Sequence, residues 1–323
     1  MYLSFYGLKK QPFHVTPDPE LLYLSPSHAK ALAAITDGIE ERRGFIAVTG
    51  DVGVGKTTVL RSYLHLKKGG PLKTVYVFNA RLTFEGLLKT IYRELALPIP
   101  GASVAEMVDR LREVLIEESR KGNTVVLFID EAQNMSADTL ESLATMSGSG
   151  TSGEKLLQVV LVGQPEFKKA LRRLRHLKER LAVNATIRPL SRAESLEYLR
   201  FRLKHAGTDF ASVFTASALK MIAGASKGIP RVLNILCDNA LVRGFSRLER
   251  PITKATVKEI VRSFKGRPRL LRRRLPLTSI FGPGITSFVG SARVPSTERR
   301  GSIHLVEREE DDVVVRPPAA RKG

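Results

Sequence analysis

The chain has 323 residues, 43% of them hydrophobic, with a mean hydropathy of -0.08. At about 150 residues per domain, this length predicts roughly two domains, and the composition is sufficient to bury a core. Lys and Arg number 52 against 32 Asp and Glu, so the formal net charge is +20. That balance favours acidic partners, such as nucleic acid or an anionic membrane surface, and says nothing about the fold.

Cysteine content and hydropathy bear on the compartment. A lone cysteine, Cys237, excludes an intramolecular disulfide framework and fits a reducing environment. No segment approaches the ~18 unbroken apolar residues of a membrane span. The residues after Met1 also lack the apolar region of a signal peptide. We therefore expect a cytoplasmic protein that can also associate peripherally with an anionic partner.

Residues 1–188 predict an α/β core with a parallel sheet, because short apolar runs alternate there with amphipathic helices. All four expected strands are apolar on both faces, as a sheet covered by helices requires. These strands are 45–49, 74–79, 124–129 and 156–162. Helices are expected from Pro26 to about residue 42, after a capping box at Ser103 and Glu106, and over the basic stretch 168–180.

Residues 189–265 predict a small all-helical lid, because they contain several helical patterns and no strand-like run. A capping box at Ser191 and Glu194 begins the first helix. The expected helices are 191–205, 215–226, 230–247 and 253–264. Residues 266–323 offer no periodic apolar face to offset the ordering entropy, so we expect a disordered tail that is first basic and then acidic.

A glycine-rich segment between an expected strand and an expected helix matches G-x-x-x-x-G-K-[ST]. We call it the glycine loop; it consists of Gly50, Asp51, Val52, Gly53, Val54, Gly55, Lys56 and Thr57, with Thr58 next to it. Glycines let main-chain N–H groups curl around phosphates, and a helix N-terminus favours negative charge. Lys56 can reach the β- and γ-phosphates of a nucleotide, and the Thr57 hydroxyl can ligate Mg²⁺. A chance glycine turn is disfavoured, because the lysine, the threonine and the flanking strand are all present.

The apolar run 124–129 ends in two carboxylates, Asp130 and Glu131. Asp130 at a strand end can hold the Mg²⁺ shell, and Glu131 can orient or deprotonate an attacking water. The alternative is a strand that leaves the core through acidic residues. The glycine loop upstream favours the first interpretation.

Three further positions are candidates, each with an ordinary alternative. Gln164 follows an expected strand and either contacts the γ-phosphate or is a turn residue before Pro165. Arg180 ends the basic helix and either reaches a neighbouring subunit's nucleotide as an arginine finger or is one more solvated charge. Arg231 begins a lid helix and either contacts phosphate from above or faces water.

Several of these segments together resemble ExeA/GspA-type AAA+ ATPases. The resemblance covers about residues 1–265 and rests on five motifs in the same order. The first is the N-terminal segment, with Phe5-Tyr6-Gly7-Leu8, Pro12-Phe13, Thr16-Pro17-Asp18-Pro19, Leu22-Tyr23-Leu24-Ser25-Pro26 and His28. The others are the glycine loop, Ile129-Asp130-Glu131-Ala132-Gln133-Asn134, Val162-Gly163-Gln164-Pro165-Glu166 and Gly228-Ile229-Pro230-Arg231.

The resemblance implies a P-loop sheet with a helical lid, ATP and Mg²⁺ as ligands, and ATP-dependent homo-oligomerisation. It also implies Gln164 as sensor 1, Arg180 as finger and Arg231 as sensor 2. Family members are paired with secretion or pilus assembly at the bacterial inner membrane, and related proteins regulate transposition. Where the family carries a Ser-Asn-Leu-Glu-like stretch, this chain has Ser147-Gly148-Ser149-Gly150, which predicts slow or conditional hydrolysis.

The leading hypothesis is therefore a Mg²⁺-dependent ATPase coupled to assembly or remodelling of secretion-type machinery. A DNA-binding ATPase switch for transposition and an ATP-binding scaffold that barely turns over are the alternatives. The basic run 262–274 is either a solvated tail or a contact for DNA, anionic lipid or a protein partner. The aromatic residues Phe5, Tyr6, Phe13 and Tyr23 either surround an adenine or fix the N-terminal segment to the core, and we favour packing.

Overall fold

The structure of the chain is a computed structural model that describes most of residues 2–265. The described ranges are 2–14, 21–67, 70–78, 80–99, 101, 103–147 and 155–265. The expected disordered tail 266–323, most of the basic run 262–274 and the glycines of 147–150 lie outside the described residues.

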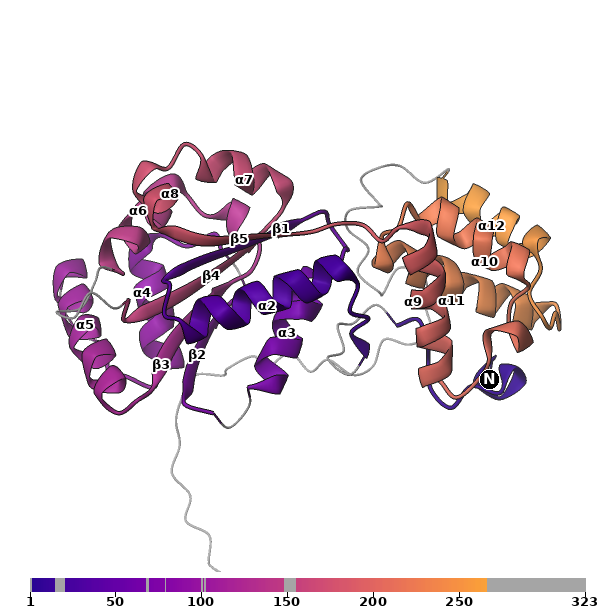
Figure 1. The fold of residues 1–323 in the computed structure, drawn as a ribbon, viewed down its shortest axis with the longest axis horizontal. Coiled ribbons are helices and arrows are strands. Elements are labelled where there is room, and N and C mark those ends of the chain that lie inside the picture. The colour runs from indigo at the N-terminus through magenta and orange to yellow at the C-terminus, as the bar shows by residue number, and fades with distance from the viewer. Residues whose placement is uncertain are drawn as a thin grey trace, which may run out of the picture. The chain divides into compact units, whose positions relative to one another are not determined.

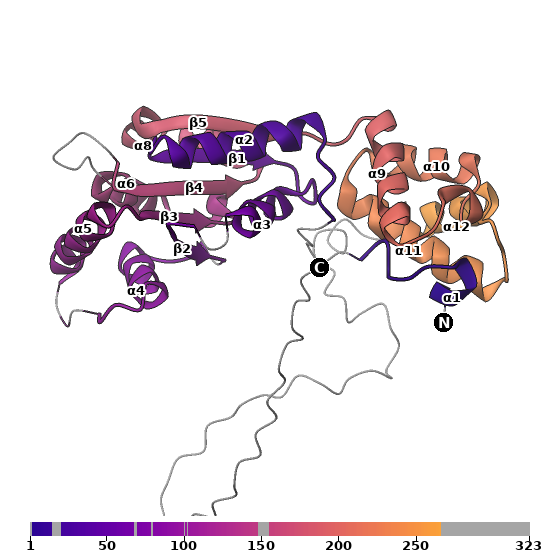
Figure 2. The same ribbon diagram turned by 60° about the horizontal axis from the view of Figure 1, so that its bottom comes forward.

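The described core contains a parallel sheet in the order β2-β3-β4-β1-β5. Figure 2 shows the strands in this order. Their bounds are β1 Phe45–Gly50, β2 Leu72–Val77, β3 Thr124–Ile129, β4 Leu157–Gly163 and β5 Leu181–Ile187. The register pairs Val48 with Val162 and Ile129 with Leu161, so β1, β3 and β4 end at the same edge of the sheet.

Two expectations about this core need correction. The sequence predicts four strands, but a fifth, β5, pairs with β1 at one side of the sheet. Its first residues alternate between half-buried and exposed, unlike the continuous apolar run of a central strand. The expected basic helix 168–180 is two helices, α7 Pro165–Leu171 and α8 Arg175–Arg180, with a break between them.

Helices cover both faces of the sheet, which confirms the three-layer α/β prediction (Figure 1). On one face, α2 Pro26–Glu40 and α3 Lys56–Leu66 pack against inward side chains such as Ile46 and Val160. The other face is covered by α7, α8 and three further helices. These are α4 Phe84–Glu94, α5 Val104–Arg120 and α6 Ala137–Met146.

The region 189–265 is helical, as expected. Its helices are α9 Arg192–His205, α10 Ala216–Ser226, α11 Pro230–Ser246 and α12 Lys254–Lys265, with a short 3-10 helix, η3, at Phe210–Ser212. The α/β core has a short 3-10 helix of its own, η2 at Ala132–Asn134. The capping box at Ser191 and Glu194 is confirmed, because both reciprocal hydrogen bonds are present. Among the described residues, no helix is both long and apolar enough to span a bilayer.

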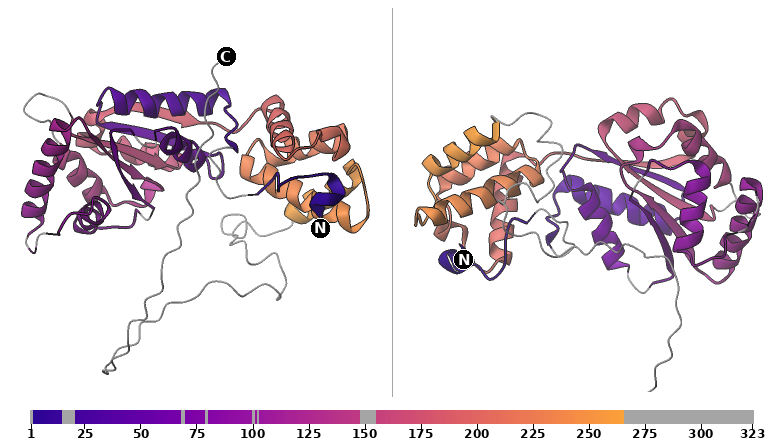
Figure 3. Two further views of the ribbon diagram at one scale, coloured as in Figure 1. Left: turned by 90° about the horizontal axis from the view of Figure 1, so that it is seen from below. Right: turned by 180° about the vertical axis from the view of Figure 1, so that it is seen from behind.

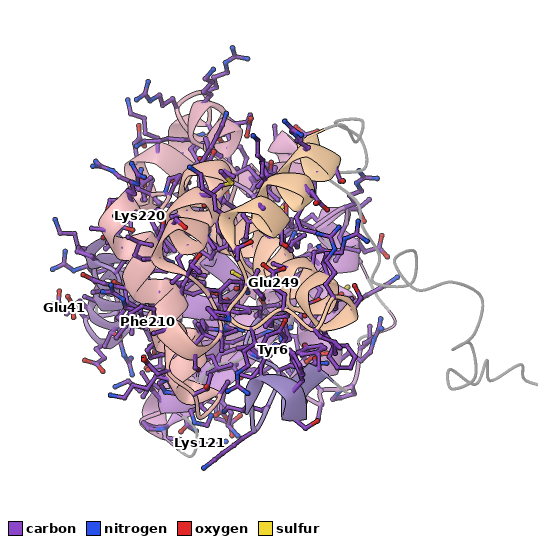
Figure 4. The ribbon with its side chains drawn as sticks, turned by 90° about the vertical axis from the view of Figure 1, so that its right-hand side faces the viewer. Tyr6, Glu41, Lys121, Phe210, Lys220 and Glu249 are labelled. Atoms are coloured by element: carbon purple, nitrogen blue, oxygen red, sulfur yellow. The ribbon has the colours of Figure 1, made fainter. Side chains whose placement is uncertain are left out.

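The N-terminal segment packs with these helices. Figure 3 shows α1, Tyr2–Tyr6, beside the C-terminal helices. The Tyr6 hydroxyl donates to the Glu249 carbonyl at 3.2 Å (Figure 4), and Tyr6 and Phe13 are both buried in the core of the helical region. Burial among these helices confirms the packing interpretation for both residues. Tyr23 packs on Tyr198, with ring centroids 6.0 Å apart, and also lines the pocket described below.

Candidate functional site

The carboxyl edge of the sheet gathers most of the predicted site residues. β1 ends at Gly50 and leads through the glycine loop into α3, which begins at Lys56. Asp130 follows the end of β3, and Gln164 follows the end of β4. Because β3, β4 and β1 are adjacent and parallel, side chains that follow these strands meet at one edge.

The glycines of the loop have conformations and neighbours that other residues do not tolerate. Gly53 and Gly55 have φ values of +83° and +105°, in the left-handed region that L-residues rarely adopt. A Cβ on Gly50 would lie 2.6 Å from the Ile187 carbonyl oxygen, and one on Gly55 would lie 2.9 Å from His28 Nε2. The loop is therefore a tight main-chain turn that ends at a helix N-terminus, the arrangement that favours a bound anion.

Lys56 is buried at the centre of this turn, with 7% of its surface exposed. Its Nζ donates to the carbonyls of Gly50 at 2.9 Å and Asp51 at 3.0 Å. Burial lowers the pKa of the Lys56 ammonium, and the nearby carboxylates, Glu131 first, oppose that shift. Among the described residues no carboxylate forms an ion pair with Lys56, so the group is a buried cation with room for an anionic ligand.

Thr57 and Asp130 form a direct contact between α3 and the end of β3. The Thr57 hydroxyl donates to Asp130 Oδ2 at 2.8 Å, and the Tyr76 hydroxyl donates to the same oxygen at 3.4 Å. Burial, followed by the charge of Asp130, raises the pKa of Tyr76. In the described part of the chain no group of three or more His, Cys, Asp and Glu could hold a metal ion alone. One hydroxyl and one carboxylate are the donor set expected for Mg²⁺, which keeps several waters and shares its shell with phosphates.

Glu131 lies next to Asp130 in an unusual main-chain conformation, with φ of 53°. Its N–H donates to Asp130 Oδ1 at 2.8 Å. Its Oε2 accepts hydrogen bonds from Gln133 Nε2 and, at 3.1 Å, from Gln164 Nε2. The structure thus brings Gln164, a predicted site residue, to Glu131. Gln133 was not predicted as a site residue, although it lies in the motif that carried the resemblance.

Arg231, in the first turn of α11, contacts the glycine loop. Its N–H donates to the Gly53 carbonyl at 3.2 Å, and a Cβ on Gly53 would lie 2.8 Å from Arg231 Cβ. A pocket lies at this contact, lined by Glu131, Arg231 and most of the glycine loop. Other lining residues are His14, Leu21, Leu22, Tyr23, His28, Thr58, Leu190, Tyr198, Arg202, Pro230 and Asn234.

Arg180 lies away from this pocket. It directly precedes β5, and Leu181 pairs with Phe45 at the amino end of β1. The six residues of β1 separate Arg180 from the glycine loop, which at about 3.3 Å per residue is on the order of 20 Å. One guanidinium nitrogen, Nη1, is buried and has no hydrogen-bond partner in the described structure. Arg180 therefore does not contribute to its own chain's pocket.

His28, on α2, supports the glycine loop through the Val54 carbonyl. From the sequence alone, His28 was named only as part of the N-terminal motif and was given no role in the site. It is 3% exposed, and its Nε2 lies 2.8 Å from the Val54 carbonyl oxygen. Since a carbonyl only accepts, Nε2 carries the proton, and Nδ1, 2.6 Å from Ser25 Oγ, accepts from that hydroxyl. Burial lowers the pKa of His28, in agreement with a neutral ring. The sequence signal for His28 was its position three residues after the expected helix cap Ser25, which places the two side chains close together.

The chain is similar to known proteins in sequence. Residues 39–171 match the AAA domain family. The chain is 39% identical over 252 residues to general secretion pathway protein A of Aeromonas hydrophila, a match that covers 76% of this chain and 45% of that protein. The chain therefore spans less than half the length of this relative.

Solved structures share the fold. The Aeropyrum pernix ORC2 protein, in ADPNP–ADP complexes, has a TM-score of 0.61 at 18% identity, over 79% of this chain and 71% of that one. The Aeropyrum pernix ORC1 protein in complex with DNA has a TM-score of 0.60 at 19% identity, over 83% of this chain and 73% of that one. Likeness at this level of identity shows the fold alone.

Proposed function

We propose that the chain, which matches the AAA domain family over residues 39–171 and has the fold of P-loop AAA+ proteins, binds ATP with Mg²⁺ and hydrolyses it. The observation that carries the proposal is the buried Lys56, whose Nζ bonds only to the loop carbonyls of Gly50 and Asp51 among the described residues. Lys56 forms no ion pair with a described carboxylate, although Glu131, Asp130 and Asp51 lie near enough to act on its charge. An anionic ligand would therefore give this buried cation a direct partner.

Each residue of the pocket edge has a role in this proposal. Bound Mg·ATP supplies the phosphoanhydride bond and a cation that neutralises its charge. Lys56 and the loop N–H groups hold the phosphates, and the Thr57 hydroxyl and Asp130 hold the cation. Glu131 takes the proton of the attacking water, since its Oε1 accepts no hydrogen bond from a described residue while Oε2 accepts two. Arg231 contacts the phosphates from the helical side.

We further propose that hydrolysis drives assembly or remodelling of secretion-type or pilus-type machinery on the cytoplasmic side of the inner membrane. The identity of 39% to general secretion pathway protein A supports this pathway. Homo-oligomerisation is part of the proposal. Arg180 lies at the opposite edge of the sheet from its own glycine loop, and we propose that it acts on the nucleotide of a neighbouring subunit.

Two substitutions separate binding from turnover. We expect Lys56→Ala to abolish binding of a fluorescent ATP analogue, because it removes the buried cation. We expect Glu131→Gln to keep binding and to lower the hydrolysis rate by about 10²- to 10⁴-fold, the range of a general base. Lys220→Ala, exposed on α10 (Figure 4), is the matched lysine control. Retained turnover in Glu131→Gln would contradict the assigned base.

A DNA-binding switch is the second candidate, favoured by an exposed basic surface on α7 and α8 and the linker between them. Its members Lys169, Arg172, Arg173 and Lys178 are exposed, and none forms an ion pair with a described residue. Among the described side chains of residues 165–180, no large apolar side chain is exposed. Such a surface fits the phosphate backbone of a duplex.

The test is ATP hydrolysis with and without a short duplex at two salt concentrations. Strong stimulation that weakens with salt, and that is lost in the triple variant Lys169→Ala, Arg172→Ala, Arg173→Ala, would favour the DNA switch. Turnover that is indifferent to DNA would favour the secretion-type function. Lys220→Ala is again the control, since it removes one exposed lysine outside this surface.

A further inference from the structure

We infer that Gln133 is a positioning residue for Glu131: its side chain occupies one carboxylate oxygen and leaves the other to the attacking water. This inference rests on the proposed hydrolysis of ATP. Nothing in the sequence reasoning or the comparisons assigns a role to Gln133. Three hydrogen bonds link Glu131 and Gln133, which follow β3, with each other and with Gln164, which follows β4.

The three residues form a closed ring. Gln133 lies in η2 and donates from Nε2 to Glu131 Oε2. Its Oε1 accepts the main-chain N–H of Gln164 at 3.0 Å. Gln164, the N-cap residue of α7, returns to the same Glu131 Oε2 through its own Nε2 at 3.1 Å. Gln133 therefore bridges the carboxylate and the main chain of the neighbouring strand end.

The chemistry of the partners fixes which way the Gln133 amide points. A main-chain N–H can only donate, so the atom facing Gln164 N must be the oxygen of Gln133. The NH₂ group then faces Glu131, whose ionised carboxylate only accepts. The usual ambiguity between the two ends of an amide is absent here.

The main chain of Glu131 is held by its own hydrogen bonds, independently of the ring. The Glu131 N–H is bound to Asp130 Oδ1 at 2.8 Å, and its carbonyl accepts from Asn134 N at 2.9 Å. With the main chain fixed at a φ of 53°, the side-chain torsions are the remaining freedom. Gln133 and Gln164 remove it by binding Oε2, so Oε1 is presented in one orientation.

Loss of Gln133 leaves the Glu131 carboxylate with one donor and deprives Gln164 N–H of its acceptor. We expect the carboxylate to sample several orientations, which lowers the rate of proton abstraction but not the binding of ATP. A misplacement of about 1 Å can reduce a rate by about a hundredfold. We therefore expect kcat to fall by roughly tenfold to a hundredfold, with the Kd for ATP unchanged.

The experiment compares Gln133→Met and Gln133→Glu with Asn134→Ala in the full chain. Methionine keeps the length of the side chain but cannot donate, and the glutamate of the second variant would place one carboxylate against another. Asn134 is exposed on the same short helix, so its variant controls for changes to η2. Binding of a fluorescent ATP analogue and steady-state hydrolysis are measured for each, and single-turnover hydrolysis is measured for Glu131→Gln alone and with Gln133→Met.

Support requires three results: kcat falls in both Gln133 variants, ATP affinity stays, and Gln133→Met adds nothing to Glu131→Gln. A kcat within about twofold of the unaltered chain overturns the inference, because the expected loss is at least about tenfold. A parallel loss of ATP affinity or an additive effect in the double variant overturns it as well. If Glu131→Gln is inactive while Gln133→Met is fully active, only this inference fails. If Glu131→Gln itself hydrolyses normally, the proposed base fails and this inference with it.

Discussion

The Thr57 hydroxyl donates a 2.8 Å hydrogen bond to Oδ2 of Asp130, and this bond joins the start of α3 to the end of β3. The two residues are 73 positions apart in sequence. The bond orients the side chains of both proposed Mg²⁺ ligands.

Because of this contact, we expect two variants of Thr57 to differ in stability and in ATP binding. Thr57→Val removes the donor, leaves Asp130 short of a partner, and should reduce the free energy of unfolding by about 1–3 kcal/mol. It should also weaken ATP binding in Mg²⁺ but not in EDTA. Urea unfolding and ATP titrations under both conditions measure these effects. Thr57→Ser keeps the hydroxyl and should behave like the unaltered chain; equal losses in the two variants would contradict the prediction.

Because Gly53 lies against Arg231, we expect Gly53→Ala to weaken ATP binding as well as stability. The new Cβ would lie 2.8 Å from Arg231 Cβ, on a main chain with φ of +83°. Gly122→Ala is a matched control, because Gly122 has φ of +79° and nothing within 4 Å of the added Cβ. Both variants should lose about 1–2 kcal/mol of stability from the left-handed conformation. Only Gly53→Ala should also bind ATP more weakly, as a nucleotide titration would show.

His28 predicts a pH dependence of stability. Its pKa is lowered from 6.5 by burial, so the unfolded chain takes up a proton at higher pH than the folded chain. The contribution of neutral His28 is therefore complete above pH 6.5 and decreases as the pH falls toward the folded pKa. The slope from one proton is at most about 1.4 kcal/mol per pH unit.

Urea unfolding at about pH 7.5 and about pH 5.5, on either side of the ordinary histidine pKa, measures this effect. In His28→Gln, which can still donate to the Val54 carbonyl but does not titrate, the difference between the two pH values should shrink. His205→Gln, a substitution at an exposed position on α9, is the control and should leave the difference as it is. An unchanged difference in His28→Gln would exclude His28 as its source.

From the position of Arg180, we expect two impaired variants to restore ATP hydrolysis when they are mixed. Arg180→Ala should bind ATP normally and hydrolyse it slowly, because Arg180 lies at the opposite edge of the sheet from its own glycine loop. Mixing it with Lys56→Ala should restore turnover, since the Lys56 variant supplies Arg180 to the intact pocket of the other chain. Hydrolysis of the mixture and of each variant alone decides the matter. A mixture no more active than its components would contradict a shared site.

The sequence by itself determined the parts of the site that are local. The glycine loop is recognisable because one turn between a strand and a helix supplies the glycines, Lys56 and Thr57 within the short segment 50–57. Asp130 is recognisable because it ends a continuous apolar strand. Such patterns depend only on neighbours in the chain. The strand β5 was missed because its half-exposed start does not follow the apolar pattern of a central strand.

Only the tertiary structure decided which distant residues meet. The strand order places β4 beside both β3 and β1, and this brings Gln164 to Gln133 and Glu131, which are 31 and 33 positions away. The same sheet places Arg180 at the edge opposite to the pocket, and α2 places His28 under Val54. Strand order arises from packing and hydrogen bonding between segments far apart in the chain, so no local pattern of residues encodes it.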